Sequence, residues 1–279
     1  AVDLASASGV ETTVVDAYSR WIAALESQGS AEQATTLAET LAKTYPRSAP
    51  ALATLAELHS RRGQAEQAIA PWQAVLALAP QDVAARVGLA QALASLGRYD
   101  EAQELVQQGL ALPAGQVELL TAAGDLLAAQ GVEGATGRQA IERYQEALAA
   151  NPAYWPAATR LAQLFLSRDQ ASQALQTMDA AVQRWPELYQ LHALRGDALR
   201  QLGRQPEALA AYRQAIDLAP APLSSADPLN AALARLHARL GEAQLATNNF
   251  SAAEQSFRQA LRYGDQWSRY GGLLDQWSR

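Results

Sequence analysis

The chain has 279 residues, a formal net charge of −6 and a sequence pI near 5.2. Its 49% hydrophobic residues exclude a disordered chain, and its 17 glycines and 12 prolines are too few for a collagen-like one. The absence of cysteine excludes disulfides and thiolate metal sites. Lys43 is the single lysine and the arginines are scattered, so no basic run exists that could bind nucleic-acid phosphates.

Three residue columns recur along the chain at intervals close to 34 residues. The alanine column comprises Ala34, Ala68, Ala102, Ala140, Ala174, Ala208 and Ala253. A second column, mostly glycine, comprises Gly29, Gly63, Gly97, Gly131, Asp169, Gly203 and Asn248. The third comprises Pro46, Pro80, Pro152, Pro186 and Pro220. Because the columns keep the same intervals, the chain is an array of repeats.

Each repeat is predicted to be two amphipathic helices joined by a tight turn. The glycine column lies where the first helix must end, since glycine takes the left-handed cap conformation without steric cost. Asp169 and Asn248 fill the same slot in the fifth and seventh repeats. The prolines close the second helix, because proline cannot continue one. Small residues recur where paired helices must approach closely, at Ala56, Ala90, Gly124, Ala162, Gly196 and Gly241.

The sixth repeat shows the residue pattern in full, with Gly196, Leu199, Gly203, Ala208, Tyr212, Ala215 and Pro220. The fifth repeat has the matching set Leu161, Ala162, Phe165, Ala174, Met178, Ala181 and Pro186. This pattern resembles the tetratricopeptide repeat family over about Val15 to Tyr263, nearly the whole chain. The resemblance implies an all-α, right-handed superhelical solenoid of antiparallel helix hairpins, with a C-terminal capping helix.

We expect an N-terminal lead-in at 1–14 and then seven repeats, at 15–48, 49–82, 83–116, 117–154, 155–188, 189–222 and 234–263. Four extra residues within 132–138 lengthen the turn of the fourth repeat. A loop at 223–233 precedes the seventh repeat, and within it Asp227 followed by proline suits the start of a helix. Residues 264–279 are expected to cap the array or to begin a further repeat, and the segment Asp-Gln-Trp-Ser-Arg occurs there twice without a physical explanation.

The sequence offers little that could carry catalysis. His59, His192 and His237 each fall in a different repeat, at positions normally taken by an apolar or aromatic residue, so we assign them to packing. No histidine pair has metal-ligand spacing, and no glycine-rich segment sits between a strand and a helix as a phosphate-binding loop requires. We therefore expect a protein that is not an enzyme and that has no cofactor and no metal.

The resemblance places a binding site in the concave groove, which the first helix of each repeat lines in this family. The groove positions are mostly polar, and more of their charged residues are acidic than basic. The candidate partner-binding residues are Glu57, Arg61, Gln91, Glu118, Asp125, Gln163, Asp197, Arg200, Arg235 and Glu242. Such a groove favours a peptide or helix that carries arginine or lysine. A solvated helix face without a binding role is the competing interpretation.

The predicted function is a protein–protein interaction scaffold that holds a partner peptide or helix in this groove. Two alternatives remain open at this point: a positioning module of a larger bacterial envelope or polysaccharide-export assembly, and a self-associating scaffold. No apolar stretch approaches the length of a membrane span, and no nucleic-acid partner is expected. The sequence leaves the compartment open between the cytoplasm and the periplasm.

Overall fold

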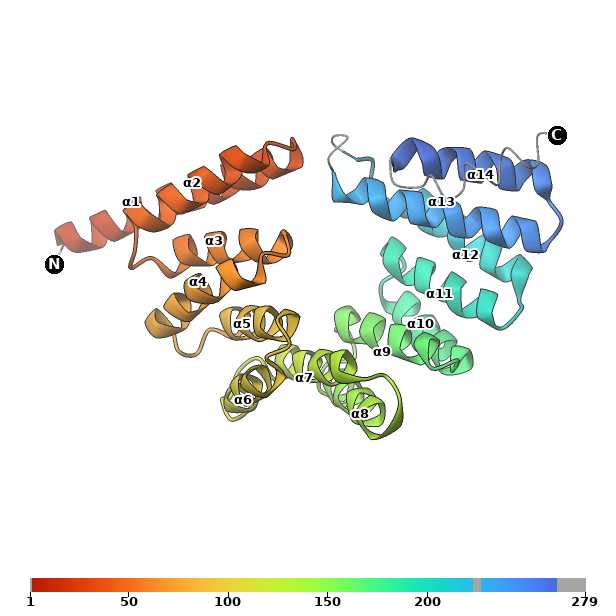
Figure 1. The fold of residues 1–279 in the computed structure, drawn as a ribbon, viewed down its shortest axis with the longest axis horizontal. Coiled ribbons are helices and arrows are strands. Elements are labelled where there is room, and N and C mark those ends of the chain that lie inside the picture. The colour runs from red at the N-terminus through yellow and green to blue at the C-terminus, as the bar shows by residue number, and fades with distance from the viewer. Residues whose placement is uncertain (1, 223–226, 265–279) are drawn as a thin grey trace. The chain divides into compact units, whose positions relative to one another are not determined.

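The computed structural model describes residues 2–222 and 227–264, and the regular structure in these ranges is α-helical (Figure 1). It divides into two compact units, Ala1–Ala150 and Asn151–Arg279, named unit 1 and unit 2 below. The helices of unit 1 are α1 (Val2–Ser27), α2 (Ala31–Thr44), α3 (Ala49–Arg61), α4 (Ala65–Leu78), α5 (Val83–Ser95), α6 (Tyr99–Leu110), α7 (Gln116–Gln130) and α8 (Gly134–Ala150). Those of unit 2 are α9 (Trp155–Ser167), α10 (Ala171–Arg184), α11 (Tyr189–Gln201), α12 (Gln205–Leu218), α13 (Pro228–Ala246) and α14 (Phe250–Tyr263).

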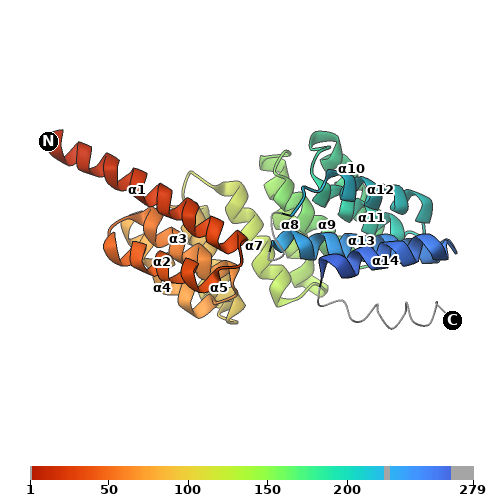
Figure 2. The ribbon, with the colours of Figure 1, turned by 90° about the horizontal axis from the view of Figure 1, so that it is seen from above.

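Each odd-numbered helix packs against the even-numbered helix that follows it, so each unit is a stack of helix hairpins (Figures 1 and 2). We call the odd-numbered helices first helices and the even-numbered helices second helices. Within a unit, each second helix also packs against the first helix of the next hairpin. Contacts between neighbouring hairpins are the defining property of a helical solenoid. The all-α solenoid predicted from the repeat pattern is confirmed.

The alanine column forms the seam along which the two helices of each hairpin meet. All seven of its members are buried, with exposed fractions of 0 to 1%. A methyl side chain at this position lets the helix axes approach, and the larger core side chains pack around it. The proline column also lies where the sequence predicts, since each proline comes two residues after the last residue of α2, α4, α8, α10 or α12.

Six hairpins share one turn geometry between their helices. The turn residue has a left-handed backbone at Gly29, Gly63, Gly97, Asp169, Gly203 and Asn248, with φ between 57° and 78°. The amide of the next residue then donates to the carbonyl five residues back, as Gln170 does to Phe165 at 2.8 Å. This bond satisfies a helix-end carbonyl that would otherwise have no partner. The prediction that Asp169 and Asn248 substitute for glycine in this turn is confirmed.

The left-handed turn predicted at Gly131 is wrong. Its φ of 166° is extended backbone, and the left-handed residue of this hairpin is Gly134, with φ +66°. The four extra residues of the fourth repeat do not simply lengthen the turn, because α8 takes up part of them and reaches 17 residues. The earlier start of α8 shifts the reversal of the chain to Gly134.

Two predicted irregular segments are more helical in the structure than the repeat interval suggested. Helix α1 begins at Val2, so it includes most of the lead-in expected at 1–14, where no proline interrupts it. Helix α13 begins at Pro228, so residues 228–233 of the expected loop are helical. The Asp227 carboxylate accepts from the Leu229 amide at 2.9 Å, which confirms Asp227 as the N-cap. The capping helix expected beyond Gly264 lies outside the described residues.

Three hairpins pair a glycine on the first helix with an aromatic ring on the second. A Cβ added at Gly124 or Gly196 would lie 2.5 Å from the ring of Tyr144 or Tyr212, and one at Gly241 would lie 2.8 Å from Phe257. No real Cβ approaches a ring that closely, so these rings fit only over glycine. Where the first helix instead carries buried alanine at 90 or 162, the equivalent position of the second helix holds the smaller Val106 or Met178.

The second repeat has alanine at the glycine position and tryptophan at the aromatic position. The ring of this tryptophan packs against the first helix of the next hairpin. Ala56 is fully buried and Trp72 occupies the equivalent aromatic position, 4% exposed. Its indole lies over Gly88 on the next first helix, where an added Cβ would be 2.5 Å from Trp72 Cε2. The indole Nε1 donates to Ser60 Oγ at 3.2 Å. The glycine that accommodates this ring therefore belongs to the neighbouring hairpin and not to the hairpin of the tryptophan.

Two glycines with open space around them provide a direct test of the turn geometry. Gly63 has φ +70° and Gly131 has extended backbone, and no heavy atom lies within 4 Å of a Cβ added at either one. We expect Gly63→Ala to destabilise the protein, because a left-handed backbone costs a residue with a Cβ about 1–2 kcal/mol. Gly131→Ala should leave stability unchanged or raise it by up to about 1 kcal/mol. Urea titrations of the two variants measure the difference, and equal midpoints would contradict it.

Candidate functional site

The ten candidate residues all lie on first helices, and each unit holds five of them. Unit 1 carries Glu57, Arg61, Gln91, Glu118 and Asp125 on α3, α5 and α7, and unit 2 carries Gln163, Asp197, Arg200, Arg235 and Glu242 on α9, α11 and α13. We call the surface at these repeat positions the first-helix face. Seven of the ten are exposed, Asp125 and Glu242 are half-buried, and Asp197 is buried. The candidate set therefore mixes available and internal side chains.

In the first two hairpins, charged residues of this face bond to one another. The Arg61 guanidinium lies 2.6 Å from Glu26 Oε2 on α1 and 3.6 Å from Glu57 Oε2 on its own helix. Arg62 reaches the same Glu26 at 3.3 Å and donates to the Ala31 carbonyl at 2.8 Å. The Arg61 side chain is 52% exposed, so solvent screens its ion pairs and leaves them weak. Glu57 thus remains open to another cation.

Two aspartates at the same repeat position accept hydrogen bonds from tyrosines of their own hairpins. The Tyr144 hydroxyl donates to Asp125 Oδ1 at 2.7 Å, and the Tyr212 hydroxyl donates to Asp197 Oδ1 at 2.9 Å. In both hairpins glycine precedes the aspartate, and the ring that lies over this glycine brings its hydroxyl to the next residue. These two aspartates therefore have an internal role that their place among the candidate partner-binding residues did not reveal.

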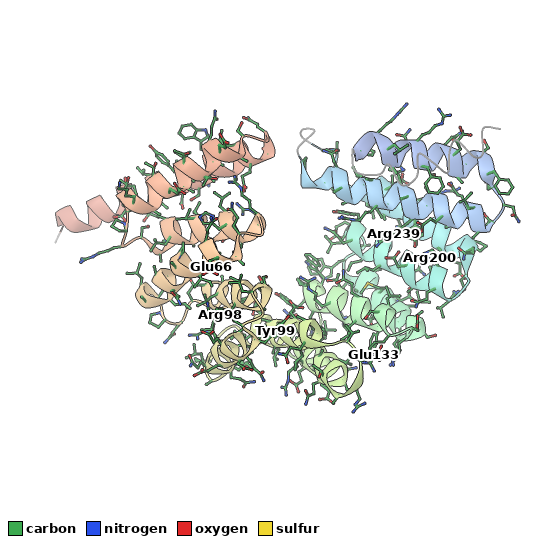
Figure 3. The ribbon with its side chains drawn as sticks, viewed as in Figure 1. Glu66, Arg98, Tyr99, Glu133, Arg200 and Arg239 are labelled. Atoms are coloured by element: carbon green, nitrogen blue, oxygen red, sulfur yellow. The ribbon has the colours of Figure 1, made fainter. Side chains whose placement is uncertain are left out.

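Asp197 has a second partner, Arg239, which is absent from the sequence-predicted set. Arg239 Nη1 on α13 lies 2.9 Å from Asp197 Oδ2 on α11, so both carboxylate oxygens are engaged. Arg239 and Arg200 are both labelled in Figure 3, and the Arg200 guanidinium lies next to the Tyr212 hydroxyl. Arg239 is four residues from Arg235, one helical turn along α13, and that spacing is the signal that could have identified it.

Burial dominates the electrostatics of this cluster. It raises the pKa of Asp197, while Arg239, Tyr212 and Arg200 pull that pKa down and Glu242 adds to the rise. The pKa of Tyr212 is also raised above its ordinary value, first by burial and then by the neighbouring carboxylate. The tyrosine therefore keeps its proton and remains a donor at neutral pH. The arrangement is an internal ion pair between α11 and α13, with a tyrosine as a further hydrogen-bond donor.

The histidines have the packing roles that the sequence predicts. His59 is 7% exposed with Nδ1 at 2.8 Å from Gln64 Oε1, and His192 is 2% exposed with Nε2 donating to the Pro186 carbonyl at 2.8 Å. The His237 ring stacks on Tyr263 with centroids 5.6 Å apart, and burial lowers the pKa of this histidine. Across the described residues, no three His, Cys, Asp or Glu side chains come together in a cluster that could hold a metal ion.

Two shallow pockets of about 450 Å³ lie away from the candidate residues. One lies between α1 and α2, beside Trp21, Leu25 and Leu37, and the Trp21 side chain above it is 55% exposed. The other lies along α10 and reaches Leu202 and Arg204. None of the ten candidate residues lines either pocket. Within the described part of the chain, no helix combines the length and the apolar character of a membrane span.

The Asp197 cluster predicts a pH-dependent loss of stability in Arg239→Ala. Removing this cation raises the native pKa of Asp197 further above its unfolded value of about 3.9. When the native state binds the proton more tightly than the unfolded state does, the free energy of unfolding falls as the pH rises from the unfolded pKa to the native pKa. We therefore expect Arg239→Ala to cost about 1–3 kcal/mol at neutral pH, with the deficit closing as the pH falls to about 4.

Thermal unfolding of wild type and variant across this pH range measures the deficit. In an Asp197→Asn background the same arginine substitution should show no such closing, because no carboxyl group remains at this position to titrate. A deficit in Arg239→Ala that is constant with pH would show that Asp197 does not carry it.

Models of known families match most of the chain. Residues 27–108 match the family described as anaphase-promoting complex, cyclosome, subunit 3. Residues 137–187, 159–221 and 234–263 match tetratricopeptide repeat families. No curated protein is similar enough in sequence to count as a match.

Solved structures with the same fold are distant in sequence. A tetratricopeptide repeat protein from Parabacteroides merdae is 17% identical with a TM-score of 0.58, over 94% of this chain and 97% of that one. The Cut9–Hcn1 hetero-tetramer of the APC/C is 17% identical at 0.63, and the human IFIT1 dimer with m7Gppp-AAAA is 15% identical at 0.64. These matches cover 93% and 83% of this chain but only 48% and 54% of those chains, and at such identities they show the fold alone. The repeat columns, the hairpin stack and the family matches agree that the chain belongs to the tetratricopeptide repeat family.

Proposed function

We propose that this protein is an interaction scaffold that holds a peptide or helix of a partner protein on its first-helix face. The tetratricopeptide fold is in general a scaffold for protein–protein interaction. The observation that carries the proposal is the pair of exposed polar side chains at one repeat position of the consecutive first helices α3 and α5, Glu57 and Gln91. Polar side chains spaced one per helix can bond to successive groups of a bound segment.

The acidic character of unit 1 favours a basic partner segment. The groove positions of its first helices carry one arginine, Arg61, and five acids, which are Asp16, Glu26, Glu57, Glu118 and Asp125. Asp125 accepts from a tyrosine and Glu26 pairs with two arginines, whereas Glu57 has only the solvent-screened pair with Arg61 at 3.6 Å. Asp16, Glu57 and Glu118 are exposed and lie on three different helices. They are the side chains most available to an incoming arginine or lysine.

The structure suggests a sharper test of this face than substitution of every acid on it. Changing Asp125 or Asp197 would break an internal hydrogen bond and confuse binding with stability. Glu57 and Glu118 are exposed, and changing them breaks no buried hydrogen bond; Glu57 loses only its solvent-screened pair with Arg61. Glu104 on α6 and Glu142 on α8 are exposed acids on second helices of the same unit, so their substitution makes a control with the same change in charge.

We expect Glu57→Lys with Glu118→Lys to weaken the binding of a fluorescent peptide of alternating arginine, alanine and leucine about tenfold or more at low salt. Glu104→Lys with Glu142→Lys should change the affinity less than about threefold, because only long-range charge is altered. Fluorescence anisotropy measures both, and circular dichroism checks that the helices persist. Equal losses in the two variants, or crosslinks of the peptide confined to second helices, would rule out the first-helix face.

A further inference from the structure

The two units share one fold but carry opposite net charges. Residues 1–150 contain 17 acidic and 9 basic residues, whereas residues 151–279 contain 11 acidic and 13 basic residues. The whole excess of acid in the chain therefore belongs to unit 1. The charge on the surface of a scaffold governs which partner segments that surface attracts. The two units therefore differ in the segments that they can bind.

On the first-helix face of unit 2, the buried acid is neutralised from within. Asp197 is 7% exposed, with one oxygen bonded to the Tyr212 hydroxyl and the other to the Arg239 guanidinium. A carboxylate held in this way presents little negative charge to a partner. Arg195, on the same helix, is also engaged, because its Nε donates to Asp179 on α10 at 2.6 Å.

Two arginines of this face remain available. Arg200 on α11 and Arg235 on α13 are exposed, and no carboxylate among the described residues forms a salt bridge with either one. Arg200 lies beside the Tyr212 hydroxyl and within the electrostatic reach of Glu242, and Arg235 lies near the Tyr189 ring. The candidate positions of α9 carry no charge, since Gln163 occupies the equivalent of Asp197 there. The positive side chains of this face thus outnumber its exposed acids.

We propose that the first-helix face of unit 2 binds an acidic segment of a partner protein, with Arg200 and Arg235 as the contacting cations. This inference rests on the proposed function of the first-helix face and assigns a partner chemistry to its second half. Guanidinium groups form paired hydrogen bonds with carboxylates, and the two arginines project from consecutive first helices. A segment that engages both must therefore carry acidic side chains far enough apart to reach two helices.

The assignment contrasts with unit 1, where the exposed acids of the first-helix face include Glu57 and Glu118. A partner that occupied both units would need basic residues for unit 1 and acidic residues for unit 2. A segment of uniform charge would be attracted by one unit and repelled by the other. Each unit thereby favours a segment whose charge is opposite to its own.

The test uses the whole chain and two fluorescent peptides of equal length, one alternating glutamate with alanine and leucine and the other with arginine in place of glutamate. Arg200→Glu with Arg235→Glu should weaken the binding of the acidic peptide about tenfold or more at low salt. The matched control, Arg184→Glu with Arg213→Glu, changes two exposed arginines of the second helices α10 and α12 and should cost less than about threefold. Binding of the basic peptide to the same variants shows that they remain folded.

Equal weakening in both variants, or no effect of Arg200→Glu with Arg235→Glu, overturns the assignment. A photo-crosslinker on the acidic peptide separates the two levels of the argument. Crosslinks on the first helices of unit 1, or an acidic peptide that does not bind while the basic one does, overturn this inference alone. Crosslinks only on second helices, or failure of both peptides to bind, overturn the proposed function as well.

Discussion

The structure depends on helices that are too short to be stable in isolation. Most of its helices have 12 to 15 residues, a length at which an isolated helix is marginal in water. Each one therefore persists only by burying a stripe of its surface against its neighbours. The fully buried alanine column and the repeated left-handed turn follow from this need, because both bring two short helices together at a fixed separation. What a partner meets is the surface that remains after this packing is complete.

The same need explains which parts of the fold can be predicted from the sequence. A left-handed residue at the turn locates the end of the first helix in six hairpins, and a proline locates the end of the second helix in five. Gly131 misled the prediction because its repeat contains four extra residues, and only the structure shows that α8 extends to take some of them up. Residues 228–233 were misplaced for the same reason, since a repeat interval cannot tell a long loop from a helix that starts early.

The candidate site was predictable in its placement and less so in its chemistry. Repeat positions identify the residues on first helices, because they follow from the period alone. They do not show that the hydroxyls of Tyr144 and Tyr212 donate hydrogen bonds to the carboxylates of Asp125 and Asp197, because those bonds depend on how each ring lies over a glycine. Nor do they reveal Arg239, which reaches Asp197 from the next first helix. One repeat position thus holds structural acids and exposed polar groups, and only contacts distinguish them.

The fit of an aromatic ring over glycine has a consequence for how the repeats can diverge. In the seventh hairpin, alanine cannot replace Gly241 while Phe257 stays, and a smaller residue at 257 would leave a void over glycine. Alanine with methionine, as in the fifth hairpin, is an equally packed solution, yet each single step towards it passes through a less stable protein. In such a hairpin the two residues must therefore change together for the packing to be kept, whereas an exposed residue of the same helix can change alone.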